Sequence, residues 1–530
     1  MNTSQFDNYK DLSSESFEFA NTEKRITDKK LETKSLSYFA DALIRFGKNK
    51  ASVVAAVIIL LIVLFAIIVP ITFNGPQTKV MVTYYQKLPS RIASVDMVGI
   101  LDGGVDDDYN ERALIFEYAK GVAAISEGDN IVPLSAAYDS EYQPVLKINQ
   151  VKSVKQGGKI NTLYNARVDQ YLAVGFITEQ LTTEQLEKVK EWEKATGKQI
   201  LYPIIATNDY NFKGDPKNPN YWYKVSGKGT PIRLNPNDPK GYDELSYGDN
   251  LVLEDNYLRD KDGNLVYAKY SGSDSGDQYT VRVLFYNYYQ YLYGTTPDYL
   301  LGTDSQGYDL AVRMAGGIRL SLILAVCVSL VNFVIGAIYG AIEGYYGGAI
   351  DLTMERITDI LSGVPFIVVA TLFQIHLTNT GKVGPFGSLI FAFVLTGWIG
   401  TASRVRSQFY RFKNQEYILA ARTLGARDAR IIWKHIFPNT LGTIITSSVL
   451  VIPGVIFSES MLSYLGIVSL GDASGTSLGT LLSEASAIWT DYPHLMIAPA
   501  LVISLLMICF NLFGNGLRDA FNPSLRGVEE

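Results

Sequence analysis

The chain contains two cysteines in 530 residues, Cys327 and Cys509, and both lie inside apolar segments. The long polar region over residues 74–293 therefore has no disulfide available to it. A secreted eukaryotic domain of that size usually carries disulfide bridges, because oxidising compartments let them form and persist. The lack of cysteine therefore favours a bacterial cell surface for this region.

Histidine is scarce as well, and the three histidines, His376, His435 and His494, lie far apart on different segments. They are poor candidates for a shared zinc site. The sequence also lacks G-x-x-x-x-G-K-[ST], the loop that holds nucleotide phosphates. The acidic run Asp106–Asp108 with Glu111 lacks the glycine and spacing of an EF-hand, so we interpret it as a solvated loop. We expect no catalytic, cofactor-binding or metal site in this chain.

Long apolar runs are what the sequence has instead. Residues Ala51–Phe73 carry no charge and are long enough to cross a bilayer as a helix. The run is longer than the core of a signal peptide and has no small-residue cleavage site, so we interpret it as a retained span. Arg45, Lys48 and Lys50 precede it, which predicts a cytoplasmic amino end. Five more apolar segments follow, at Ile318–Ile342, Ile360–Leu377, Ser388–Ala402, Leu441–Phe457 and Leu495–Phe513.

The basic residues orient these six predicted spans. The stretch Ser403–Asn439 carries eight lysine and arginine residues, whereas Ser458–His494 carries none. Because positively charged loops stay in the cytoplasm, the first stretch is predicted to be cytoplasmic and the second to be an external loop. Both termini are then cytoplasmic, and residues 74–293 lie outside the cell. The basic residues cluster beside membrane spans, so we expect no nucleic-acid partner.

Residues 74–293 are polar and rich in tyrosine, with local signals for both helices and strands. Thr182 and Gln185 form a capping-box pattern that opens a helix, and Gly197 closes it. Lys261–Asn264, between two short apolar stretches, predicts a β-hairpin. We therefore predict an all-α polytopic membrane protein with six transmembrane helices and an inserted extracellular α+β domain.

The predicted domain boundaries follow from these assignments. They are a disordered cytoplasmic tail over 1–36, a cytoplasmic approach and first transmembrane helix over 37–73, the extracellular insertion over 74–293, a five-helix core over 294–517 with a cytoplasmic loop at 403–439, and a cytoplasmic tail over 518–530.

The most informative stretch is Gln415–Asn439, where Ala420 and Ala421 are followed by Gly425 and then by His435–Pro438. Two small residues on one helical turn let another surface approach closely, and the glycine permits a sharp change of chain direction. The proline is predicted to end this element just before the chain re-enters the membrane. An amphipathic helix lying on the membrane surface is the alternative interpretation.

This spacing resembles the EAA loop by which permease subunits of ATP-binding-cassette (ABC) importers dock on their ATPases. Leu419 stands where that loop has glutamate, with Glu416 three positions earlier. Three further segments are similar to signatures of the C-type subunits of dipeptide and oligopeptide permeases: Leu301–Asp309, Glu459–Gly466 and Asn511–Pro523. The chain is identified as a member of that family, which implies the type I importer permease fold. Typical members have a short connection where this chain has residues 74–293.

The resemblance implies a transport subunit and not an enzyme. It implies a path for peptides formed with a second, B-type permease, two cytoplasmic ATPases that bind ATP and magnesium, an extracellular lipid-anchored substrate-binding protein, and a bacterial plasma membrane. The ATPase-coupling residues carried over are Glu416, Ala420, Ala421, Gly425, His435 and Pro438. An importer of nickel or another small solute, or a membrane-anchored surface receptor, is the alternative.

Polar and small residues inside the spans suggest two further roles. Intramembrane polar residues are candidates for a translocation path, although hydrogen bonding between helices explains them equally well. Glycines at four-residue spacing predict close helix packing, with a partner that the sequence does not identify. No intramembrane charge pair stands out, which argues against proton coupling. The path candidates are Asn332, Gln374 and Asn511, and the glycines are Gly336, Gly340 and Gly344.

Overall fold

The computed structural model describes residues 38–72, 82–92, 99–156, 159–206, 219–224, 232–235, 238–244, 252–272, 276–378, 380–381, 383–470 and 476–521. The predicted disordered tail at 1–36 and the end of the predicted carboxyl-terminal tail, residues 522–530, lie outside the described residues.

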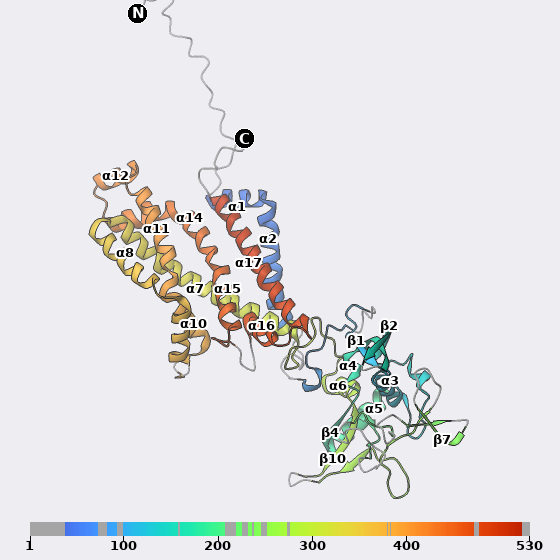
Figure 1. Ribbon diagram of the computed structural model, residues 1–530. Helices are drawn as coiled ribbons and strands as arrows, with labels where there is room; N and C mark the ends of the chain where they lie inside the picture. Colours follow the sequence, from blue (N-terminus) through green and yellow to red (C-terminus); the bar gives the residue numbers. More distant parts are fainter. Residues whose placement is uncertain are drawn as a thin grey trace, which may run out of the picture.

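The protein has two parts (Figure 1): a bundle of long helices, and beside one end of it a unit of strands and short helices. We call the described residues between 82 and 299 the α/β unit. The bundle helices are α1 (Tyr38–Lys48), α2 (Lys50–Thr72), α7 (Leu310–Tyr346), α8 (Gly348–Ser362), α9 (Phe366–Phe373), α10 (Pro385–Gly397), α11 (Ile399–Phe412), α12 (Glu416–Thr423), α13 (Asp428–Arg430), α14 (Phe437–Val449), α15 (Val451–Tyr464), α16 (Leu478–Ser486) and α17 (Pro493–Phe521).

Among the described residues, five helical runs are long and apolar enough to cross a membrane: α2, α7, α10 with α11, the run Asp428–Tyr464, and α17. A sixth crossing exists if the pair Gly348–Ser362 and Phe366–Thr378 is one span, and this pair is bent by 72°. Pro365 lies at the break, where its missing N–H and its restriction of the preceding residue interrupt the helix. If that pair is one span, the six predicted spans correspond to five continuous runs and one broken one.

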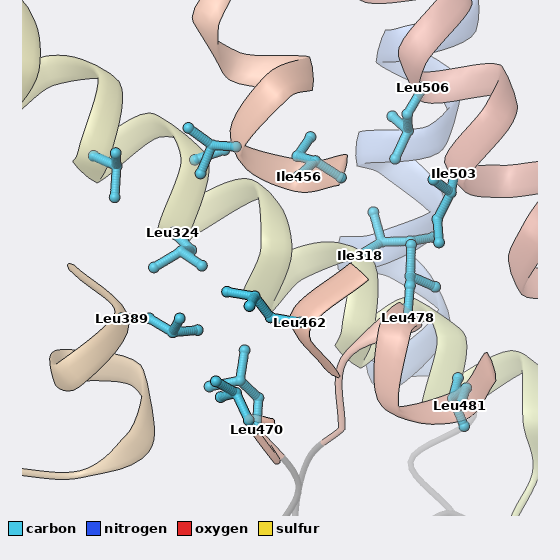
Figure 2. Close-up of a cluster of buried hydrophobic side chains, with 14 of the residues drawn as sticks. Ile318, Leu324, Leu389, Ile456, Leu462, Leu470, Leu478, Leu481, Ile503 and Leu506 are labelled. Carbon is cyan, nitrogen blue, oxygen red and sulfur yellow. The ribbon is translucent and has the colours of Figure 1, made fainter. Parts of the chain in front are cut away.

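The bundle core gathers apolar side chains from helices that are distant in sequence (Figure 2). Ile318 and Leu324 come from α7, and they lie with Leu462 of α15 and Leu478 of α16. Leu478 is fully buried, so α16 belongs to the core. The prediction of an external loop over Ser458–His494 is therefore wrong in part, because α15 continues to Tyr464 and α16 packs back into the bundle.

The α/β unit contains three small antiparallel sheets. The strand orders are β1-β3-β2, then β4-β10-β5 with β9 paired to β10, and β7-β6-β8. The strands are β1 (Gly104–Asn110), β2 (Val145–Gln156), β3 (Lys159–Asp169), β4 (Phe176–Thr182), β5 (Leu201–Tyr202), β6 (Ile232–Asn235), β7 (Asp238–Glu244), β8 (Val252–Leu253), β9 (Ala268–Tyr270) and β10 (Gln278–Leu284). The helices are α3 (Glu111–Ile125), α4 (Gln170–Ala173), α5 (Thr183–Thr196) and α6 (Phe285–Tyr293), with short 3-10 turns at Thr83–Tyr85 and Leu134–Ala137.

Two local predictions in this unit are confirmed. Helix α5 begins at Thr183 with both capping-box bonds to Thr182 present, and Gly197 ends it at φ +71°. The predicted hairpin at Lys261–Asn264 forms, with the Val266 amide donating to the Leu258 carbonyl at 3.0 Å. Both features depend on residues close in sequence, which is why local patterns predict them.

The acidic run Asp106–Asp108 lies in strand β1, so its interpretation as a loop is wrong. Positively charged side chains on the other strands of this sheet allow the acidic run to form a strand. Arg167 on β3 lies 2.8 Å from the Asp106 carboxylate, and Lys152 on β2 lies 3.2 Å from that of Asp108. The opposite charges on the adjacent strand β3 and on β2 beyond it offset the repulsion along the run.

The tyrosines of the α/β unit form much of its interior. Tyr85, Tyr171, Tyr289 and Tyr299 are each fully buried, and the hydroxyls of Tyr289 and Tyr299 lie 3.1 Å apart. Large rings supply the apolar area that this unit needs in the absence of disulfides. The richness in tyrosine therefore reflects packing.

The α/β unit joins the bundle at a seam between residues 82–91 and 299–309. The Leu88 amide donates to the Thr303 hydroxyl at 2.8 Å, and the Lys87 amide donates to the Asp304 carbonyl at the same distance. Arg91 and Tyr299 pair as an antiparallel bridge. The chain thus leaves the bundle and returns to it through adjacent, hydrogen-bonded segments.

Gly302 should tolerate no side chain at this seam. A Cβ there would lie 2.1 Å from the Leu88 carbonyl oxygen, at φ +80°. Gly294 is the matched control, since its φ is +71° and no atom lies within 4 Å of a Cβ. Gly294→Ala should lose about 1–2 kcal/mol, the cost of a left-handed alanine, and Gly302→Ala should lose more. Thermal unfolding in detergent measures both, and equal losses would contradict the close contact.

Candidate functional site

Helix α12 lies at the end of the bundle opposite the α/β unit (Figure 1). Its exposed surface includes apolar side chains: Leu424, just after the helix, is 88% exposed, and Leu419 and Tyr417 are 47% and 41% exposed. Glu416 and Ala420 are also exposed, and Ala421 is half-buried. We call the exposed side chains of Tyr417, Leu419 and Leu424 the docking face. Because α12 lies outside the membrane-length helices, these exposed apolar side chains are candidates for contact with another protein.

Gly425 produces the turn that follows α12. Its φ is +81°, and no atom lies within 4 Å of the position that a Cβ would take. The Gly425 and Ala426 amides donate to the carbonyls of Arg422 and Ala421 at 3.0 Å each, which closes the helix end. The glycine is needed here for its backbone conformation and not for space.

The prediction that Pro438 ends the docking segment is wrong. A continuous helical run extends over Asp428–Tyr464, and Pro438 lies in the first turn of α14. A π-helical turn at Ile431–Ile436 precedes the proline, and such turns accommodate a missing backbone donor inside a helix. The half-buried His435 lies within that turn, and its carbonyl accepts a hydrogen bond from the Asn439 side chain at 2.8 Å.

A small apolar cluster holds α12 on the bundle. Ile418 is the fully buried residue of α12, and it belongs to a cluster with Ala341 of α7, Phe409 of α11 and Ile436 before α14. One side of the helix is therefore fixed to three other helices while the docking face stays exposed. A displacement of α12 must move the residues around Ile418, because packed interiors do not deform freely.

Polar contacts connect the same loop to the end of α7. The Tyr345 hydroxyl donates to the Asp428 carboxylate at 2.5 Å, and Arg422 donates to the Tyr345 hydroxyl at 3.3 Å. Arg422 precedes the Gly425 turn and Asp428 follows it, so one α7 side chain contacts both sides of the turn. Sequence reasoning missed Tyr345 and Asp428, because no local pattern shows that residues 83 positions apart meet.

A charge network ties α7, α8 and α11 together near this end. Arg406 donates to Asp351 at 2.6 Å and to Glu355 at 2.8 Å, and its guanidinium lies 3.5 Å from Glu343. The Tyr410 hydroxyl also donates to Asp351, at 2.6 Å. Glu343 and Arg406 lie just beyond the predicted spans Ile318–Ile342 and Ser388–Ala402, so the expectation that no charge pair stands out inside the spans stays a prediction. One arginine can satisfy several carboxylates through its planar fork of donors.

The three glycines of α7 face α11. A Cβ at Gly340 would lie 2.1 Å from the Ala402 carbonyl oxygen, and one at Gly336 would lie 2.7 Å from the Thr401 side chain. At Gly344 it would lie 2.7 Å from Phe409. The two helices therefore approach until backbone meets backbone, as small residues permit in membranes. The structure gives the glycine stripe a partner within the same chain.

The three candidate path residues make different contacts. Gln374 accepts a hydrogen bond from Ser388 of α10 at 2.7 Å, and the exposed Asn511 donates to its own helix at Met507. Asn332 is buried and its amide lies where a Cβ on Gly397 would be. These contacts link neighbouring helices or a single helix, and the structure does not bring the three side chains into one site.

The carboxylate of Glu459 is buried in the bundle. The sequence analysis matched its segment to a family signature but assigned this residue no role. Glu459 is fully buried on α15 and accepts hydrogen bonds from Ser321 of α7 at 2.8 Å and Ser463 at 3.0 Å. Glu459 and Ser463 stand in the motif segment Glu459–Gly466 quoted above, whereas Ser321 lies on α7. Hydroxyl donors compensate part of the cost of burying the carboxyl group, so these motif residues fasten α15 to α7.

The motif at Leu301–Asp309 supports the start of α7. The Asp304 carboxylate accepts from the Gln306 and Tyr308 amides at 2.9 Å each, and Arg313 lies 3.2 Å from it. Asp309 is the N-cap of α7 and accepts from the Ala311 amide at 2.8 Å. Burial raises the pKa of the Asp309 carboxyl to about 6.

The membrane-length helices and the exposed loop helix define a polytopic membrane transport component. Residues 334–527 match the family model described as "Binding-protein-dependent transport system inner membrane component", and residues 37–88 match "N-terminal TM domain of oligopeptide transport permease C". Both models leave out residues 89–333, which include most of the α/β unit.

Curated relatives agree with these models. The chain is 42% identical over 236 residues to the dipeptide transport system permease protein DppC of Bacillus subtilis, covering 43% of this chain and 70% of that protein. It is 42% identical over 229 residues to the oligopeptide transport system permease protein OppC of the same species, covering 43% and 73%. The chain belongs to the family of C-type permease subunits of oligopeptide and dipeptide ABC transporters, with the type I importer permease fold.

Among solved structures, the chain is similar to a chain of the MetNI methionine ABC transporter in an inward-facing conformation. The sequence identity is 16%, the TM-score is 0.33, and the match covers 40% of this chain and 96% of that one.

A methyl group at the α7–α11 contact should destabilise the bundle. In Gly340→Ala the Cβ would meet the Ala402 backbone at 2.1 Å, whereas at Gly316, on the same helix, nothing lies within 4 Å. We expect Gly316→Ala to be neutral or stabilising by up to about 1 kcal/mol, the gain in helix propensity, and Gly340→Ala to lower stability. Thermal unfolding of both variants tests this, and a change of the same sign in both would contradict the assigned contact.

Stability should depend on pH through Asp309. Its folded pKa of about 6 lies above its unfolded value, so the native state binds the proton more tightly. The associated stability is present below about pH 4 and is lost as the pH rises to about 6. Asp309→Asn keeps the cap without the titration. Melting temperatures from pH 4 to 7 should fall more steeply for the wild type, and parallel curves would contradict the assignment.

Proposed function

We propose that this chain is one of two permease subunits of an ATP-driven importer of dipeptides or oligopeptides in a bacterial plasma membrane. Its family membership and the names of its relatives support peptides over nickel or another small solute. The single observation that carries the transport role is α12, a helix with exposed apolar side chains whose segment is fastened to the bundle through Ile418 and Tyr345. The second subunit would be a B-type permease, and the two would form the translocation path between them.

The orientation we propose places α12 and both termini in the cytoplasm and the α/β unit outside the cell. The loop that contains α12 is basic, and the segment that contains α16 has no lysine or arginine, which supports this orientation. Helices α12 and α16 lie at opposite ends of the bundle (Figure 1). A lipid-anchored binding protein would then deliver its substrate on the side of the α/β unit.

We propose that ATP hydrolysis takes place in two partner ATPases, which hold ATP and magnesium, and that α12 fits a groove on one of them. Closure of the ATPases would displace the docking face. The apolar cluster that includes Ile418 and Phe409, and the contact of Tyr345 with Asp428, would pass this displacement to α11 and α7. Rigid-body rearrangement of this kind needs a ligand that binds the two states differently, and ATP in the partners supplies it.

Contacts among α7, α8 and α11 favour their movement as one rigid group. Helices α7 and α11 are in backbone contact at Gly340, and Arg406 connects both to α8. A force on α12 would therefore move these three helices together. The π-helical turn before Pro438 is a local irregularity at which α14 could change direction relative to α12.

The docking face can be tested without disturbing the fold. Leu424→Ser changes a side chain that is 88% exposed, and Ile100→Ser, at a 62% exposed position in the α/β unit, is the matched control. We expect Leu424→Ser to lower peptide-stimulated ATP hydrolysis and uptake at least about tenfold, the effect of removing a central interface residue, and the control to leave both unchanged.

The assay uses the complete importer in proteoliposomes, with subunit stoichiometry measured for each variant. Normal uptake by Leu424→Ser in an intact complex would contradict docking through α12. Crosslinks from this position to lipid alone would support the membrane-surface alternative.

A further inference from the structure

A cleft lies between α11, α14 and α17, with a volume of about 440 Å³. This volume falls in the range of small-ligand sites, roughly 300–1,000 Å³. Arg404 on α11 and Arg518 in the last turn of α17 both line it. The residues that contribute hydroxyl groups include Ser403, Ser407, Thr443 and Ser447.

The two arginines have no counter-charge in the cleft. None of its described lining residues is acidic, and within the described part of the chain neither Arg404 nor Arg518 forms an ion pair. Arg406, two positions along α11, shows the contrast, because it contacts Asp351, Glu355 and Glu343. These three acidic residues therefore pair with Arg406 and not with the cleft arginines. Two positive charges line the cleft without a described acidic partner.

The same wall of the cleft offers free hydrogen-bond donors. Ser403 and Ser407 lie one helical turn apart on α11 beside Arg404, and neither hydroxyl makes a hydrogen bond within the described residues. The Ser447 hydroxyl, in contrast, donates to the Thr443 carbonyl of its own helix at 3.0 Å. The cleft therefore combines two guanidinium groups with two unused hydroxyls, a donor set that suits a carboxylate or phosphate group.

We infer that this cleft binds the terminal carboxylate of a peptide in transit. The inference rests on the proposed peptide-import function. The α-carboxylate is shared by every peptide, so contacts to it would serve cargo of any sequence, whereas side-chain pockets would not. Arg518 lies at the end of α17 that is on the α12 side of the bundle (Figure 1), so the cleft belongs to the later, cytoplasmic part of the proposed path.

The test compares one tripeptide as the free acid and as its carboxyl-terminal amide, with uptake measured in proteoliposomes that contain the complete importer. Arg404→Gln and Arg518→Gln remove one charge each. Arg411→Gln is the control, because Arg411 lies on the same helix and does not line the cleft. The uptake of each peptide by a variant is divided by the uptake of the same peptide by the wild type. This ratio cancels any preference of the binding protein for one peptide.

We expect each cleft variant to lower uptake of the free acid about tenfold, as for the loss of a charge-assisted hydrogen bond, with little change for the amide. Arg411→Gln should affect neither peptide. Arg404→Lys, which keeps the charge but not the planar fork, should give an intermediate loss for the acid. Subunit stoichiometry and basal ATP hydrolysis confirm assembly of each variant.

Equal loss for acid and amide in assembled Arg404→Gln and Arg404→Lys would overturn the inference. So would a bound anionic phospholipid, detected by native mass spectrometry, that is lost in Arg404→Gln while both peptides enter normally, because the cleft would then hold a lipid phosphate. A wild-type importer that transports neither peptide would instead refute the proposed function.

Discussion

The contact on which the bundle depends is the backbone approach of α7 to α11. Gly336, Gly340 and Gly344 permit it, since the lipid supplies no hydrophobic drive between helices and close packing must hold them together. The Arg406 network and the Tyr345–Asp428 contact both start from the same end of α7. Were α7 farther from α11, the contact between Glu343 and Arg406 would not form.

Sequence patterns predicted those features that depend on neighbouring residues or on composition. The apolar runs, helix α5 with its capping box, and the hairpin at Lys261–Asn264 belong to this class. One predicted span is a pair of helices bent at Pro365. The helix that continues through Pro438 contradicts the expectation that a proline ends a helical segment. At Pro438 a preceding π-helical turn accommodates the missing donor, which single-residue preferences do not anticipate.

The site was predictable in outline only. Motif spacing located α12 and the turn at Gly425, but the contacts that give α12 mechanical support join distant segments, as at Tyr345 and Asp428. Gln374 shows a second limit: the sequence allows either a path residue or a bond between helices, and only the structure shows its hydrogen bond to Ser388 of α10. Composition records that a polar group is present, whereas its partner depends on packing.

The seam at Leu88 and Thr303 has an evolutionary consequence. Because the segments that enter and leave the α/β unit are hydrogen-bonded neighbours, a short connection could join them directly with little loop-closure cost. The unit is thus a module that a lineage can acquire, lose or exchange while the membrane helices keep their arrangement. Selection on the α/β unit is thereby separated from selection on the membrane helices.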